Sequence, residues 1–319
     1  MTAIKFGTDG WRAVIAEDFT FANARIVAQS IARYVVRCED ARKGVIIGYD
    51  HRFASDTIAA AAAEVLSASG TPIFLTDKPC PTPAVSLLVR QRAAAGGLMI
   101  TASHNPYQWN GIKYKASYGS SALPSIIAQI EKELAVVQQE SVPRLPARKN
   151  LIQPLEPRAP YLDTLEKLVD WKRLRGAKLR FVSDVMHGSA AGLLVELFRR
   201  NGVACDEIRG TRDPRFGGVH PEPIEPHIEA LRQAVLAGKF DAGLCADGDG
   251  DRIAPSTAMA CSSILTRFLH CSSGTWRERA TCRETLPRRS PSPNLSTNLP
   301  PSSTESFMKR PSASSTSAS

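Results

Sequence analysis

The sequence predicts an α/β fold: two consecutive α/β/α sandwich domains with mixed sheets, followed by a disordered Ser/Pro-rich tail. Three observations lead to this prediction. Segments with strand and helix patterns alternate up to about residue 252, a Pro-, Arg- and Gln-rich stretch interrupts the alternation once, and Ser, Thr and Pro supply nearly half of the residues after 254. Such alternation is typical of helices packed on sheets, and 319 residues are enough for roughly two domains of about 150 residues each.

The expected elements of the first domain, residues 1–145, follow from local patterns. Residues 19–37 carry apolar side chains at helical spacing after Thr20, a suitable N-cap. Residues 44–49 (GVIIGY) form a continuous apolar run, which is typical of a strand covered on both faces. Residues 55–69 are Ala-rich and end before a glycine, which predicts a helix. A strand, a helix and a strand are then expected at 72–75, 83–91 and 97–102.

The pattern stops and restarts around a stretch that we interpret as a linker. Residues 146–160 are rich in Pro, Arg and Gln and show no clear period. The second domain is expected over residues 161–253. Its strands are predicted at 179–183, 203–208 and 240–245, and its helices at 190–201 and 227–237. Residues 254–319 lose this periodicity. We expect them to be disordered because they cannot bury enough apolar surface to offset the entropy of ordering them.

Composition argues against several classes of protein. There is no apolar run of about 18 residues and no secretory pattern at the N-terminus, so we expect neither a membrane span nor secretion. The seven cysteines are scattered without a CxxC pair, as in a cytoplasmic protein with reduced thiols. The net charge is +9, but eight Lys or Arg against three Glu lie beyond residue 252, so more than half of the excess is in the tail. We therefore expect no nucleic-acid or membrane partner, and the oligomeric state stays open.

The first chemical motif is Ser103 within residues 101–106 (TASHNP), followed by residues 110–113 (NGIK). A serine just after a predicted strand lies at the carboxyl edge of a sheet, where α/β proteins bind their ligands. The alternative is an ordinary polar turn made by Ser, Asn and Pro. An isolated SHNP sequence favours the turn, whereas its occurrence together with the two motifs described next favours a functional serine.

The second motif is residues 247–252 (DGDGDR), which also follow a predicted strand. Three carboxylates at alternate positions of a glycine-rich loop can converge on one hard cation. A calcium EF-hand loop is rejected because it needs Gly at its sixth place and Glu at its twelfth, where this chain has Arg252 and Ala258. A solvated acidic turn is less favoured, because three close carboxylates repel one another unless a cation is present.

The third motif is residues 7–12 (GTDGWR), in which Arg12 can offer a two-pronged donor to a phosphate. Alone it is weak, because a glycine-flanked arginine is more often part of a surface turn.

Together and in this order, the three motifs resemble the α-D-phosphohexomutase family, the phosphoglucomutases and phosphomannomutases. The resemblance spans roughly residues 4–253. Supporting matches occur at residues 48–52 (GYDHR), 81–84 (PTPA), 184–188 (DVMHG) and 220–226 (HPEPIEP).

The resemblance implies an intramolecular phosphotransferase of carbohydrate metabolism. Ser103 would carry a phosphoryl group, and its phosphate would bind Mg²⁺ together with Asp247, Asp249 and Asp251. The phosphoserine would donate to a hydroxyl of a hexose monophosphate, and the resulting bisphosphate would return its other phosphate. The net reaction would interconvert the 1- and 6-phosphates of glucose or mannose, with glucosamine as a further candidate.

The resemblance also implies roles for four cationic residues. Arg12, His104 and Lys113 match positions around the phosphoserine, where Lys113 or Arg12 would assist proton transfer, and Arg252 matches the substrate-side arginine that follows the metal loop. The alternatives are a local turn hydrogen bond for His104 and a solvated strand position for Lys113.

The chain departs from the family after Arg252. The family has four domains, and neither its sugar-recognition string GExSGH nor its phosphate-binding string RxSGTEP occurs here. If the reading frame is moved back by one base, residues 254–279 permit AVDGNGVFVDPHQIFALLLWHLAGER and residues 307–318 permit HETPIGFKYIG, both similar to the family's continuation.

We therefore hypothesise a one-base frameshift that truncates the family sequence after its second domain; a natural Ser/Pro-rich appendage is the alternative. Resequencing the DNA across codons 250–260 tests this. The hypothesis predicts impaired or absent mutase turnover. The alternative function is a non-catalytic Mg²⁺- or phosphate-binding remnant, or an unstable product.

Overall fold

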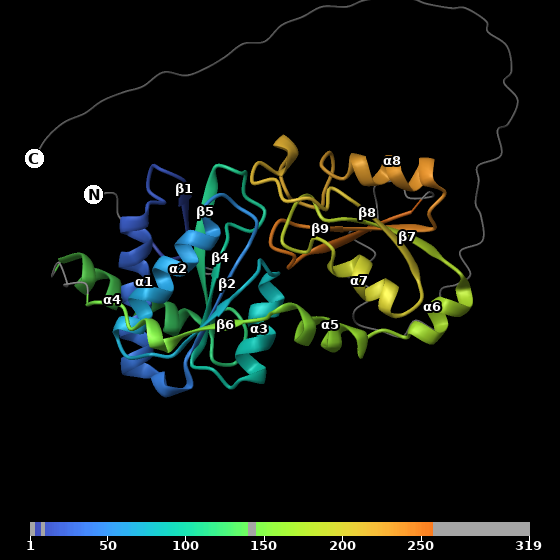
Figure 1. Cartoon of the computed structure of the whole chain (residues 1–319). Coiled ribbons are helices and arrows are strands. Elements are labelled where there is room, and N and C mark those ends of the chain that lie inside the picture. The colour runs from blue at the N-terminus through green and yellow to red at the C-terminus, as the bar shows by residue number, and fades with distance from the viewer. Residues whose placement is uncertain (1–3, 8–9, 140–144, 258–319) are drawn as a thin grey trace, which may run out of the picture. The chain divides into compact units, whose positions relative to one another are not determined.

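The structure, a computed structural model, confirms two α/β domains with mixed sheets (Figure 1). It describes residues 4–7, 10–139 and 145–257. Both sheets belong to one compact unit. Within the described ranges, no helix is both long and apolar enough to cross a membrane. Cys38, Cys80, Cys205 and Cys245 are free thiols.

The first sheet has six strands in the order β1-β5-β4-β2-β3-β6. Only β5 runs opposite to its two neighbours, and the other adjacent strands are parallel. The strands are β1 (Trp11–Val14), β2 (Val45–Tyr49), β3 (Ile73–Thr76), β4 (Gly96–Ile100), β5 (Trp109–Ala116) and β6 (Ile152–Leu155).

Helices cover both faces of this sheet because its buried strands carry apolar side chains on both faces. Ile47 and Leu98 pack in one core with residues of α1, α2 and α4, whereas Ile46 and Met99 pack in another with residues of α3. Thr20 caps α1, as expected, and its hydroxyl accepts a hydrogen bond from the backbone N–H of Asn23. The helices are α1 (Phe21–Cys38), α2 (Ser55–Ala68), α3 (Thr82–Gln91) and α4 (Pro124–Gln139), with short 3-10 helices at Ala41–Lys43 and Lys149–Leu151.

The second sheet has four strands in the order β10-β9-β7-β8, of which only β10 is antiparallel to its neighbour. Phe181 packs in a core with residues of α5, α6 and α7, whereas the next residue, Val182, packs in a core with residues of α8. The elements are α5 (Arg158–Glu166), α6 (Trp171–Ala177), β7 (Arg180–Asp184), α7 (Leu193–Arg200), β8 (Ala204–Ile208), a 3-10 turn (Phe216–Gly218), α8 (Glu229–Gly238), β9 (Ala242–Ala246) and β10 (Ile253–Ser256).

The expected irregular linker, residues 146–160, is wrong in part, because it contains β6 and the start of α5. Strand β6 pairs in parallel with β3, with Ile152 opposite Ile73 and Leu155 opposite Thr76. Pro154 lies within β6 and obscures the strand pattern in the sequence. It is tolerated there because β6 is the last strand of the sheet.

The predicted start of the disordered tail, residue 254, is also wrong. Residues 253–256 form β10, which pairs antiparallel with β9 and buries Ala254 and Ser256. The rest of that prediction, residues 258–319, lies outside the described residues, so the frameshift stays a hypothesis.

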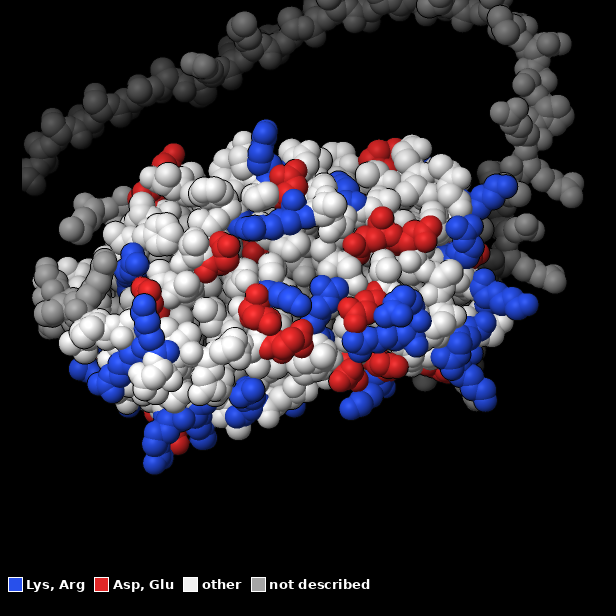
Figure 2. Space-filling view, viewed as in Figure 1, with Lys and Arg blue, Asp and Glu red and all other residues white. Residues whose placement is uncertain are grey.

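Charged side chains are mixed over the described surface. Figure 2 shows Lys and Arg side chains interspersed with Asp and Glu side chains on the face in view. No single sign of charge dominates that face.

One ion-pair cluster joins α1 to α4. Glu133 is nearly buried and accepts hydrogen bonds from Arg33 Nε at 2.6 Å and Arg37 Nη1 at 2.7 Å. Glu133→Gln is expected to lower the free energy of unfolding by about 1–3 kcal/mol, because two charge-assisted bonds weaken at a poorly solvated position. Urea unfolding measures this. Arg42→Gln, which removes an exposed pair with Asp40, should leave the midpoint unchanged; equal midpoints for both variants would contradict the argument.

Candidate active site

Ser103 lies in the loop between β4 and β5, in a backbone conformation that non-glycine residues rarely adopt. Its φ is +54° and the residue is almost fully buried. Two contacts hold it: its N–H donates to Thr101 Oγ1 at 2.8 Å, and its carbonyl accepts from Arg52 Nη2 at 2.7 Å. Strained residues of this kind persist only where their surroundings over-determine them, and they gather at functional sites.

The structure brings Ser103 and the Asp loop together across 144 residues of sequence. The Ser103 hydroxyl donates to Asp247 Oδ2 at 3.4 Å. The backbones also approach closely: a Cβ added to Gly248 would lie 2.7 Å from the Ser103 carbonyl oxygen, so only glycine fits. The serine and the three carboxylates therefore share one site, at the carboxyl ends of β4 and β9.

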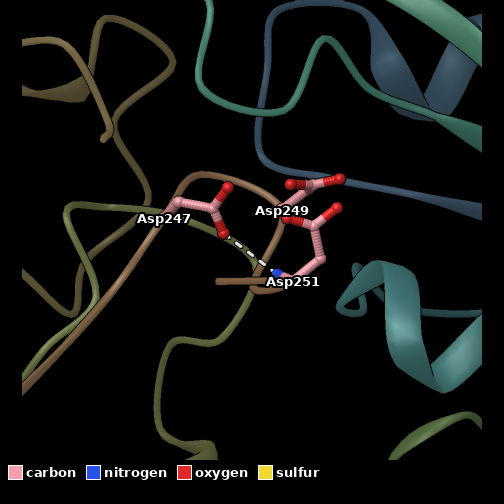
Figure 3. A group of neighbouring side chains, drawn as sticks. All are labelled: Asp247, Asp249 and Asp251. Carbon is pink, nitrogen blue, oxygen red and sulfur yellow. Dashed lines mark hydrogen bonds between the residues drawn. The ribbon is translucent and has the colours of Figure 1, made fainter. Parts of the chain in front are cut away.

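The three carboxylates of the Asp loop converge (Figure 3). One oxygen from each of Asp247, Asp249 and Asp251 lies within 4.8 Å of the others. Asp247 and Asp249 are fully buried, and Asp251 is partly exposed. The N–H of Asp251 donates to Asp247 Oδ1 at 2.9 Å, which helps to hold the loop closed.

This donor set fits a magnesium ion. Asp249 Oδ1 is buried and has no hydrogen-bond partner, which is costly for a carboxylate oxygen unless a cation binds it. All the donors are hard oxygens, which Mg²⁺ prefers. Together with the close approach of the three side chains, this oxygen is the structural observation that favours a metal.

Burial, a nearby lysine and the neighbouring carboxylates shift the pKa values of the aspartates in opposite directions. Lys113 is buried, and its Nζ lies 2.9 Å from Asp249 Oδ2 and 3.2 Å from Asp251 Oδ2. Burial would raise the pKa of Asp249, but the ammonium and the Thr82 hydroxyl, 2.5 Å away, outweigh it and lower that pKa. Burial, with the charges of Asp249 and Asp251, raises the pKa of Asp247 to about 8.

Arg252, Glu222 and His104 form a second polar group beside Ser103. Arg252 donates from Nε to Asp247 Oδ2 at 3.1 Å and from Nη1 to Glu222 Oε1 at 2.9 Å, and its Nη2 is buried without a partner. His104 Nδ1 lies 3.5 Å from the Ser103 hydroxyl, and its Nε2 lies 3.9 Å from Glu222. Burial and the Arg252 charge lower the pKa of His104.

Arg12 reaches this site indirectly. It lies on β1 opposite Gly111 of β5, and its Nη1 donates to Asn105 Oδ1 at 2.8 Å, two residues after Ser103. All the residues that the sequence singled out thus lie at or beside one site, and the contact with Asn105 joins Arg12 to the Ser103 loop.

Three further residues build the site, although no local pattern indicates their role: Arg52, Thr82 and Glu222. They lie in the supporting motifs GYDHR, PTPA and HPEPIEP respectively. The signal was therefore present in the sequence, but the contacts that define each role were not.

Comparison with known proteins follows the same division of the chain. Residues 3–141 match the domain described as phosphoglucomutase/phosphomannomutase, alpha/beta/alpha domain I, and residues 159–258 match alpha/beta/alpha domain II of that family. The chain is 30% identical over 248 residues to a phosphoglucosamine mutase of Caldicellulosiruptor saccharolyticus, covering 77% of this chain and 54% of that protein. It is 34% identical over 250 residues to one of Synechococcus sp. strain CC9311, covering 78% and 53%.

Solved structures agree. A provisionally assigned phosphomannomutase from Thermus thermophilus is 34% identical, with a TM-score of 0.73, over 81% of this chain and 58% of that one. The Paramecium phosphoglucomutase parafusin, at 22% identity and a TM-score of 0.70 over 81% and 53%, shares the fold. The chain spans about half the length of the curated relatives it matches. On these matches and this site, the chain belongs to the phosphoglucomutase/phosphomannomutase family.

Proposed function

We propose that this chain provides the phosphoserine and metal-binding part of a phosphohexomutase, which interconverts hexose 1-phosphate and hexose 6-phosphate. One observation carries the proposal: the Ser103 hydroxyl lies 3.4 Å from a carboxylate oxygen of a three-aspartate cluster. A phosphate on that hydroxyl would lie beside oxygen ligands suited to Mg²⁺, the arrangement that phosphoryl transfer needs.

The proposed reaction conserves one phosphoryl group on the protein. The bond between the phosphorus and Ser103 Oγ breaks while a bond to a hydroxyl of the hexose monophosphate forms, and the hydroxyl proton passes to a base. The bisphosphate then returns its other phosphoryl group to Ser103 and takes up a proton. Bound Mg²⁺ supplies positive charge that offsets the negative charge of the transferring phosphoryl group.

We propose the following roles for the side chains. Asp247, Asp249 and Asp251 hold the metal with the serine phosphate. Lys113 Nζ lies against two of these carboxylates, so it is placed to neutralise phosphate oxygens. In its neutral amine form it would accept the proton of the sugar hydroxyl, and as the resulting ammonium it would return that proton to the product.

The remaining cations flank the serine. His104 is proposed to polarise the Ser103 oxygen and Arg12 to orient the loop and assist with charge or proton transfer. The partnerless Nη2 of Arg252 is proposed to bind a phosphate or the sugar.

The sugar is proposed only as a class. The curated relatives described above are phosphoglucosamine mutases, and the Thermus structure is a provisionally assigned phosphomannomutase. Their names differ in the sugar, so we propose a phosphorylated hexose or hexosamine as substrate.

The proposal predicts that the purified chain takes one phosphate from glucose 1,6-bisphosphate in the presence of Mg²⁺. Intact mass and peptide mapping measure the transfer and its position, and a coupled assay with glucose 1-phosphate measures turnover. Phosphate on Ser103 without turnover would agree with the impaired turnover that the frameshift hypothesis predicts. No phosphate on Ser103, with Mg²⁺ still stabilising the fold, would contradict phosphoryl transfer and favour the alternative, a non-catalytic Mg²⁺- or phosphate-binding remnant.

A further inference from the structure

Arg52 is a fully buried arginine whose hydrogen bonds go almost entirely to one loop. Its Nη1 donates to the carbonyls of Pro106 and Trp109, both at 2.9 Å. Its Nη2 donates to the carbonyls of Ser103 at 2.7 Å and Asn105 at 2.6 Å. Through these four hydrogen bonds, one guanidinium binds four backbone carbonyls of the loop that carries Ser103.

The buried charge of Arg52 is balanced locally. Asp50, also fully buried, places its Oδ2 3.3 Å from Arg52 Nε. Asp50 is itself fixed, because its Oδ1 accepts from the Ser55 hydroxyl at 2.8 Å and from the Arg52 N–H at 3.0 Å. Burying such a pair is costly, and a more apolar pair would often stabilise the fold as well. Stability of the fold alone therefore does not account for a buried arginine at this position.

The other side of the guanidinium faces the second half of the chain. The Arg52 Cζ lies 4.8 Å from the centre of the Phe216 ring, which is fully buried. The neighbouring residue, His51, also contacts the second half of the chain, since its Nδ1 lies 2.9 Å from the His187 carbonyl oxygen. Arg52 thus lies between the Ser103 loop and a turn that follows β8.

We infer that Arg52 is a positioning residue for phosphoryl transfer: it holds the Ser103 loop in its strained conformation and sets it against the 3-10 turn that contains Phe216. The inference rests on the proposed function. Lysine cannot replace the guanidinium, because a single nitrogen with three donors lacks the planar fork that serves four carbonyls here.

Arg52→Lys tests this, with Phe216→Leu as a second variant and Glu133→Gln as a control destabilised far from the loop. The measured quantity is the initial rate of phosphate transfer from glucose 1,6-bisphosphate to Ser103, at a temperature where every variant is folded. We expect Arg52→Lys to lose at least about tenfold in rate, and Phe216→Leu a smaller factor. Glu133→Gln should keep the wild-type rate. A wild-type rate in Arg52→Lys overturns the inference.

Amide hydrogen exchange separates this inference from the proposed function. Arg52→Lys should raise exchange in residues 103–109 more than Glu133→Gln does, while Mg²⁺ still raises the melting temperature of both. If the wild-type chain takes no phosphate, the proposed function fails and exchange alone decides the inference: unchanged protection overturns it. If Arg52→Lys does not fold, Phe216→Leu must still show slower transfer and faster loop exchange than Glu133→Gln, or the inference fails.

Discussion

Ser103→Ala is expected to abolish covalent phosphate on the chain after incubation with glucose 1,6-bisphosphate and Mg²⁺. The variant removes the hydroxyl that lies 3.4 Å from Asp247. Neighbouring hydroxyls cannot replace it: Thr101 Oγ1 accepts the Ser103 N–H, and Thr82 Oγ1 is bound to Asp249. Intact mass measures the outcome, with the wild type gaining the mass of one phosphate and the variant none.

The variant should remain folded, so an absence of covalent phosphate would result from the loss of the hydroxyl and not from unfolding. The contacts of the Ser103 hydroxyl with Asp247 and His104 are long, 3.4 Å and 3.5 Å, so their loss costs little stability, while the backbone bonds to Thr101 and Arg52 stay. Ser189→Ala is a matched control, because Ser189 is also buried and its hydroxyl contacts the Asp-loop carbonyl of Gly248 at 3.4 Å. Phosphate on Ser103→Ala at the level of the control would remove Ser103 as the acceptor.

Local patterns predicted the elements whose apolar faces are continuous. The run at 44–49 became β2, and the capped periodic segment after Thr20 became α1. The sequence of strand β5, WNGIKYKA, alternates apolar residues with lysines, a pattern that indicates a strand with a solvated face. The fold instead buries Lys113 and Lys115, which this local pattern does not indicate. Helix α4 was predictable in principle, since Ile127, Ile130, Leu134 and Val137 lie on one face.

The candidate site was accessible from motifs, but its connections were not. The alternate aspartates and the serine after a strand are visible in the sequence as chemistry. In contrast, the contact of Lys113 with Asp249 spans 136 residues, and no local pattern encodes which carboxylate a lysine will meet. Arg52 shows the same gap, because its partners are backbone carbonyls, which have no sequence signature.

Asp249→Asn is expected to remove the stabilisation that Mg²⁺ gives the wild-type chain. A bound ion raises the free energy of unfolding by an amount that grows with the ratio of its concentration to its dissociation constant. Asp249 offers the one buried carboxylate oxygen of the cluster without a hydrogen-bond partner. Asparagine has a similar shape but no negative charge, so the substitution removes a charged ligand of the metal. We expect affinity for Mg²⁺ to fall at least about tenfold, equivalent to about 1.4 kcal/mol.

The metal-free variant should stay folded, which makes the loss interpretable. The asparagine oxygen can still accept from the Thr82 hydroxyl, and Lys113 keeps its pair with Asp251 at 3.2 Å. Removing one charge also relieves repulsion within the cluster. Asp163→Asn, which neutralises an exposed partner of Arg200, is the charge-matched control. Thermal unfolding at increasing MgCl₂ should show a rising midpoint for the wild type and the control and a flat one for Asp249→Asn; equal slopes for all three would place the ion elsewhere.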